Sequence, residues 1–77
     1  MVGTDLNKAN LRGANLCRAN LQEANLSKAQ LRGVNLREAN LIGANLTNAD
    51  LTGANLIGVS LNNAYLGGAS VFVLVTI

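Results

Sequence analysis

Residues 9–23 read A-N-L-R-G, A-N-L-C-R and A-N-L-Q-E, which are three five-residue units with leucine at the same place in each. The unit recurs through most of the 77-residue chain, and thirteen leucines follow one another at intervals of five residues. These leucines are Leu6, Leu11, Leu16, Leu21, Leu26, Leu31, Leu36, Leu41, Leu46, Leu51, Leu56, Leu61 and Leu66. Two positions before leucine the residue is alanine in ten units, and one position before it is Asn or Asp in ten. The two positions after leucine vary. The repeat therefore sets the register of the chain.

A period of five residues fits neither an α-helix nor a flat strand. On a helix, at about 100° per residue, successive leucines would lie about 140° apart and would form no single apolar face. On a strand, side chains alternate with period two, so an odd spacing would send leucines to opposite faces in turn. The pattern is consistent if each unit is one side of a coil that turns at every unit. Four units then make one turn of the coil, and all leucines point to its axis.

The units, including A-D-L-T-G at residues 49–53, resemble those of the pentapeptide repeat family over residues 4–68. This resemblance implies an all-β fold, a right-handed quadrilateral β-helix of about three coils. It also implies that leucine and the small residue two positions before it point inward, while the other three point outward. Glycine at the last position of a unit, as in Gly13 and Gly33, suits a turn that needs positive φ. We expect residues 1–68 to form this β-helix.

Residues 69–77 are expected to form a separate hydrophobic C-terminal segment. An uncharged apolar run begins at Val71 and has strong strand propensity. The candidate contact residues are Val71, Phe72, Val73, Leu74 and Val75. Three alternatives stay open: a strand that caps the last coil, a contact with a second copy in a homodimer, and a strand that continues into a segment absent from this sequence. Other members of the family dimerise through a hydrophobic C-terminus, and the second alternative follows from that resemblance.

The reactive side chains are too few and too scattered to predict an enzyme. The sequence has no histidine, one cysteine and four acidic residues. If residues twenty apart stack, the acids Asp5, Asp50, Glu38 and Glu23 lie on four different sides of the coil. Paired carboxylates, a nucleophile with its base, and a zinc site are therefore not predicted. We expect no catalytic residues, no bound metal and no cofactor.

The charged residues are unevenly placed, although the formal net charge is only +2. Stacking would pair Glu38 with Arg18. It would also bring four cations together on adjoining sides, namely Lys8, Arg12, Lys28 and Arg32, and like charges one strand spacing apart are mildly destabilising. This basic cluster is the candidate contact site, against the alternative of a solvated edge that aids solubility. Two outward isoleucines, Ile42 and Ile57, are expected to be exposed in the C-terminal half.

The function predicted from these features is a non-catalytic protein-interaction or structural scaffold module with an unknown protein partner. One alternative, suggested by the family, is mimicry of duplex DNA in binding to DNA gyrase, which the short length, the few acids and the net positive charge disfavour. Another is weak nucleic-acid or anion binding through the basic cluster, although nucleic acid is disfavoured because aromatic stacking residues are lacking. The longest apolar run is shorter than the roughly 18 residues of a membrane span. One cysteine and no signal-peptide pattern at the N-terminus predict a cytoplasmic location with no membrane partner.

Overall fold

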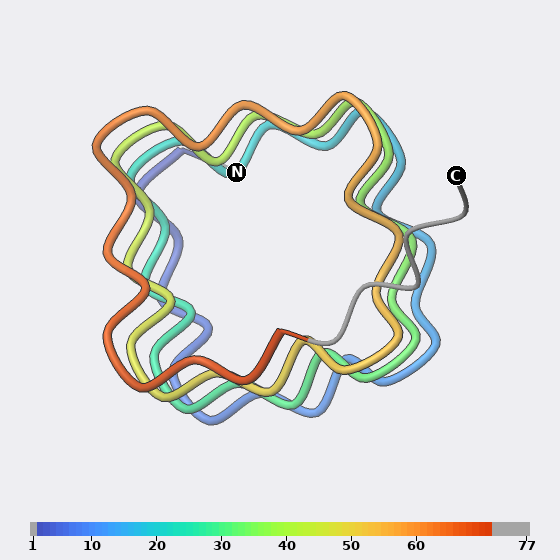
Figure 1. The fold of residues 1–77 in the computed structure, drawn as a ribbon. Helices are drawn as coiled ribbons and strands as arrows, with labels where there is room; N and C mark the ends of the chain where they lie inside the picture. Colours follow the sequence, from blue (N-terminus) through green and yellow to red (C-terminus); the bar gives the residue numbers. More distant parts are fainter. Residues whose placement is uncertain (1, 72–77) are drawn as a thin grey trace.

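A computed structural model describes residues 2–71, and this part of the chain winds as a four-sided coil (Figure 1). Parallel bridges join each residue that precedes a leucine to the residue twenty positions later, from Asp5 and Asn25 to Asp50 and Ser70. Within residues 2–71 the backbone forms no helix and no strand longer than a single bridge. The predicted all-β fold and the twenty-residue turn are therefore confirmed.

Each corner of the coil is a tight turn that begins at a leucine. The backbone N–H three residues after each leucine donates to that leucine's carbonyl oxygen, as from Ala9 to Leu6 at 3.0 Å. The two residues between them, here called the first and second turn positions, make the bend. The second turn position has φ between 58° and 72° in every unit, which is the geometry of a type II turn. Glycine holds six of these thirteen positions, and Lys, Arg, Glu or Asn holds the other seven.

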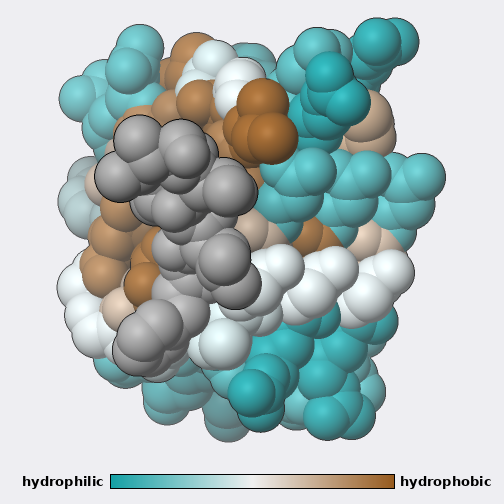
Figure 2. Space-filling view, turned by 45° about the vertical axis from the view of Figure 1, so that its right-hand side comes forward, coloured by the Kyte–Doolittle hydropathy of each residue, from teal (hydrophilic) through white to brown (hydrophobic). Residues whose placement is uncertain are grey.

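Backbone hydrogen bonds also join each coil to the next. The leucine N–H donates to the carbonyl oxygen nineteen residues later, as from Leu26 to Asn45 at 2.7 Å. The N–H before each leucine donates in the other direction, as from Asn45 to Ala24 at 2.9 Å. These bonds hold residues twenty apart one strand spacing, about 4.8 Å, from each other. Side chains that leave the coil therefore form columns, which Figure 2 shows as parallel lines of hydrophilic and intermediate side chains on one flank.

The core is a narrow interior filled by leucine and by the small residue two positions before it. Leu26, Leu36 and Leu46 are fully buried, as is Val34, which replaces the usual alanine. The burial is complete only in the middle of the rod. Leu6 and Leu61 are partly buried, and Leu66 is 40% exposed because no described coil covers it. Apolar contact is thus concentrated in the central coils.

The Asn or Asp before leucine stabilises the turn that follows. Its side-chain oxygen accepts a hydrogen bond from the backbone N–H two residues later, at 3.0–3.3 Å, in all ten units that carry Asn or Asp. Among residues 2–71, the units with Gln30, Ser60 and Tyr65 show no such bond. This is the Asx turn, in which a short polar side chain replaces a backbone acceptor. It explains why the repeat prefers these two residue types.

Replacing Asn35 by Ala is expected to lower the free energy of unfolding by about 1 kcal/mol, because the Arg37 N–H loses its 3.1 Å acceptor. Urea denaturation followed by circular dichroism measures the change. Ser60→Ala is the matched control, since Ser60 holds the same position and accepts no such bond among the described residues. Equal losses in the two variants would contradict the stabilising role of the Asx turn.

Candidate functional site

The predicted basic cluster lies on two neighbouring corners of the coil. Lys8 and Lys28 hold the second turn position at one corner, and Arg12 and Arg32 hold the first turn position at the next. Backbone bonds set the stacking, because Lys8 N donates to Ser27 O at 2.9 Å and Gly13 N donates to Arg32 O at 2.9 Å. All four side chains are exposed. The structure places them as stacked pairs, and their role in binding stays a prediction.

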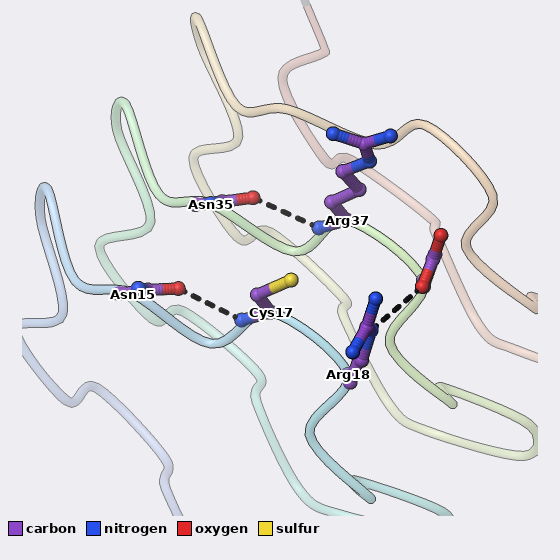
Figure 3. Close-up of polar contacts among 6 residues, drawn as sticks. Asn15, Cys17, Arg18, Asn35 and Arg37 are labelled. Carbon is purple, nitrogen blue, oxygen red and sulfur yellow. Dashed lines mark hydrogen bonds and ion pairs between the residues drawn. The ribbon is translucent and has the colours of Figure 1, made fainter.

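The Arg18 and Glu38 side chains form the ion pair that the twenty-residue stacking predicts. Arg18 Nε donates to Glu38 Oε2 at 2.8 Å, and this is the one ion pair among residues 2–71 (Figure 3). The hydrogen bond to Glu38, and then its charge, raise the pKa of Arg18. The Arg18 side chain is 77% exposed and that of Glu38 is 46% exposed, so water screens the attraction and the pair adds little to stability. The ion pair confirms that residues twenty apart stack on one another.

The Asp50 carboxylate is held in its charged form by local hydrogen bonds. The Thr52 hydroxyl donates to Asp50 Oδ1 at 2.5 Å and the Thr52 N–H donates to the same oxygen at 3.0 Å. These two bonds lower the pKa of Asp50, partial desolvation opposes them, and the charge of Arg32 adds a smaller attraction. A negative charge therefore lies directly above Gln30, at the upper edge of the basic cluster.

We expect the Asp50 carboxyl to titrate below the ordinary Asp value of about 3.9. Because the folded-state pKa is lowered, the stability from these bonds is present above the unfolded-state value and is lost as the pH falls through the folded one. Carbon-13 NMR of the carboxyl group measures the pKa directly. Thr52→Val removes the hydroxyl donor and should move the pKa back toward the ordinary value, whereas Asn45→Ala, at the neighbouring corner, should leave it in place. A pKa unmoved by Thr52→Val would contradict this assignment.

Other chemically reactive groups lie singly on the surface. Cys17 is a free, exposed cysteine, and Figure 3 shows its sulfur in the column below Arg37. Its backbone N–H donates to Asn15 Oδ1, as in the neighbouring turns. Within residues 2–71 no three His, Cys, Asp or Glu side chains gather where they could hold a metal ion. This part of the chain also contains no helix long and apolar enough to cross a membrane.

Exposed apolar side chains occur mainly toward the C-terminal end. Ile57 is 66% exposed, Tyr65 65% and Val71 45%. The expectation for Ile42 was wrong, because Ile42 is half-buried: coils lie on both sides of it, and Glu23 N donates to its carbonyl oxygen. Of the predicted C-terminal contact segment only Val71 is described. The remaining residues, Phe72, Val73, Leu74 and Val75, lie outside the described residues, so the cap and the homodimer contact stay predictions.

The Asn and Asp side chains that form the turns were missed as a structural set by sequence reasoning. The signal was present, since an Asx residue two positions before a turn residue is a known turn-forming arrangement. The mixed composition of the second turn position concealed a further regularity. Lys8 and Lys28 take the same positive φ as the glycines, at 62° and 58°, although side chains with a β-carbon disfavour it.

Comparison with known proteins agrees with this geometry. The sequence pattern of a family described as pentapeptide repeats matches residues 1–37 and 35–70, in eight copies. Among solved structures, the chain is similar to HetL from the cyanobacterium Nostoc sp. strain PCC 7120, a pentapeptide repeat protein involved in heterocyst differentiation regulation, at 45% identity and a TM-score of 0.87. It is also similar to a pentapeptide repeat protein of the Arabidopsis thaliana thylakoid lumen, at 31% identity and a TM-score of 0.85.

These matches cover most of this chain but only part of each relative. The match to HetL spans 88% of this chain and 32% of HetL, and the match to the thylakoid lumen protein spans 87% and 46%. A pentapeptide repeat protein from Cyanothece 51142, Rfr23, matches at 39% identity, with a TM-score of 0.54, over 91% of this chain and 58% of its own. No curated protein matches significantly. The chain thus spans about a third to a half of the two relatives with the higher TM-scores.

Proposed function

Since the chain belongs to the pentapeptide repeat family, whose members form right-handed quadrilateral β-helices, we propose that it is a non-catalytic module that binds a protein partner through its outer surface. No catalytic function is indicated by the family or by the matched structures. The observation that supports the proposal is the arrangement of outward side chains. They stand in columns on a backbone whose hydrogen bonds join each coil to the next, so their spacing is fixed before a partner arrives. Such preorganisation lowers the entropy lost on binding.

Affinity capture from the lysate of the source cell tests this proposal. The chain can be coupled to beads through the exposed thiol of Cys17, which leaves the sides remote from that corner free. Beads blocked with free cysteine are the control. A protein retained reproducibly by the coupled chain and absent from the control beads supports a binding module. Retention of nothing above the control, at low ionic strength and with a folded bead-bound chain, would contradict the proposal.

Mimicry of duplex DNA is the other function that the family suggests, and the surface charge argues against it. Duplex DNA carries one negative charge per about 1.7 Å, so a rod of about 16 Å would need on the order of nine acids. This chain has four acids against six Lys and Arg. We therefore expect no inhibition of gyrase supercoiling, and no drug protection, at micromolar protein. A purified acidic DNA mimic serves as the positive control. Inhibition by this chain would favour DNA mimicry over the proposed protein-binding module.

A further inference from the structure

One side of the first two coils combines the basic cluster with free amide groups. The side runs between the lysine corner and the arginine corner, and its centre is the column of Asn10 and Gln30, which are bridged to each other. All of its outward side chains are exposed. We call this surface the basic face, and it consists of Lys8, Asn10, Arg12, Lys28, Gln30 and Arg32.

The positive charge of the basic face is not neutralised by neighbouring acids. Among residues 2–71 the one ion pair, between Arg18 and Glu38, lies on another corner. Lys8 stacks with Lys28, and Arg12 with Arg32, so like charges oppose each other at one strand spacing. The Asp50 carboxylate is attracted by Arg32 but forms no ion pair with it. An anionic partner would therefore relieve the repulsion between the stacked cations, and it would not have to displace an ion pair within the chain.

The two lysines also occupy turn positions that disfavour them. Both have left-handed φ, a conformation that is strained in a residue with a β-carbon. Further along the same column the chain has Asn48 and Gly68, which take this conformation more easily. The lysines of this column thus lie only in the first two coils, where each carries a local conformational cost. Asn48 and Gly68, at the same position in later coils, carry a smaller one.

The centre of the basic face offers polar groups that have no partner within the described residues. Asn10 Oδ1 accepts from Arg12 N at 3.3 Å and from Arg12 Nε at 3.2 Å, which orients the guanidinium beside the face. The Asn10 amide nitrogen and the whole Gln30 side-chain amide make no hydrogen bond among residues 2–71. Amides between two cationic edges can bond the backbone of an extended chain while the edges bind its carboxylates.

We propose that the basic face binds an extended, acidic peptide segment of a partner protein. The inference rests on the proposed binding function and names the partner's chemistry. The first two coils provide two rows of cations one strand spacing apart. In the next coil Asp50 lies above Gln30, and its negative charge repels anions there, so the basic face is only two coils high. A single extended peptide chain fits a surface as narrow as the basic face. Single-stranded nucleic acid fits less well, because Tyr65 is the one aromatic residue among residues 2–71 and stands two coils above Asn25, outside the basic face.

Fluorescence polarisation with a labelled peptide in which Asp alternates with Ser tests the proposal at low ionic strength. We expect saturable binding to the full chain, weakened by added salt, and no binding of the same peptide with Asn in place of Asp. The double variant Arg12→Gln and Arg32→Gln should weaken binding about tenfold. Arg37→Gln is the control for the change at Arg32, because Arg37 holds the same first turn position as Arg32, in the same coil and at the next corner. This control should change binding less than about twofold. All substituted side chains are exposed, and thermal unfolding checks that the variants fold.

Several outcomes would overturn the inference. These are absence of binding to the Asp peptide, an equal loss in the Arg37→Gln control, and tighter binding of labelled oligothymidine than of the peptide. Failure of the peptide is distinguishable from failure of the proposed function. If the bead-bound chain still retains a protein from lysate, and the Arg12→Gln/Arg32→Gln variant retains it equally, the binding function stands and the basic face is not its site.

Discussion

Replacing Leu36 by Ala is expected to lower the free energy of unfolding by about 3 to 5 kcal/mol, the range for a leucine truncated in a close-packed core. Leu36 is fully buried, with leucines of the coils below and above it in the same ladder. The cavity cannot collapse easily, because inter-coil hydrogen bonds fix the spacing of the coils on both sides. At roughly 0.05–0.15 kcal/mol per residue, a chain of 77 residues has about 4 to 12 kcal/mol of stability, so this loss is a large share of it. Urea denaturation monitored by circular dichroism measures the change.

Leu66→Ala is the matched control for Leu36→Ala. It removes the same atoms from the same position of the repeat, but Leu66 is 40% exposed and lies in the last described coil. A loss of about 1 kcal/mol is expected there, since much of the side chain already contacts water. Comparable losses at the two sites would mean that the central coils do not hold the core, and would contradict the burial pattern.

Much of the fold could be predicted from the leucine register, because a coil that turns at every five-residue unit brings every leucine to one axis, and four such units make the twenty-residue turn. The Arg18 and Glu38 ion pair follows from the same arithmetic and was found at 2.8 Å. The half-burial of Ile42 could not be predicted in this way. It depends on how closely the side chains of adjacent coils cover one another, which the residue spacing alone does not specify.

The candidate site was predictable in position but not in its local detail. Stacking placed Lys8 with Lys28, yet nothing in the residue type indicated that both would have left-handed φ. Lysine ordinarily avoids that region, and here the geometry of the repeat overrides the local preference. The free amide of Gln30 could not be predicted either. It becomes evident only by comparison with the Asn residues at the same position, whose side chains form Asx turns.

The second large effect is expected at Gly43, where valine should lower the free energy of unfolding by about 2 kcal/mol or more. Gly43 has φ of +70°, a conformation that a β-branched residue adopts only with strain. A β-carbon there would also lie 3.2 Å from Glu23 Cγ in the adjacent coil. Gly43→Asn is the control, because Asn48 and Asn63 already take φ of 59° and 61° at the same turn position. Asparagine adds the same β-carbon, so a loss below about 1 kcal/mol there assigns the valine effect to backbone strain.

The part of the valine effect that comes from contact with Glu23 can be separated by a double-mutant cycle with Glu23→Gly. Glu23 itself has φ of 60°, so Glu23→Gly alone should raise the free energy of unfolding by about 0.5 to 1 kcal/mol through relief of strain. In the Glu23→Gly background the contact atom is gone, and Gly43→Val then reports the conformational cost alone. Chemical denaturation of the four proteins of this cycle measures the coupling, and Gly43→Asn is measured in both backgrounds as well. If neither Gly43→Val nor Gly43→Asn destabilises the chain in either background, left-handed strain does not govern the second turn position. The lysines of the basic face would then carry no conformational cost, and that support for the peptide-binding proposal would be lost.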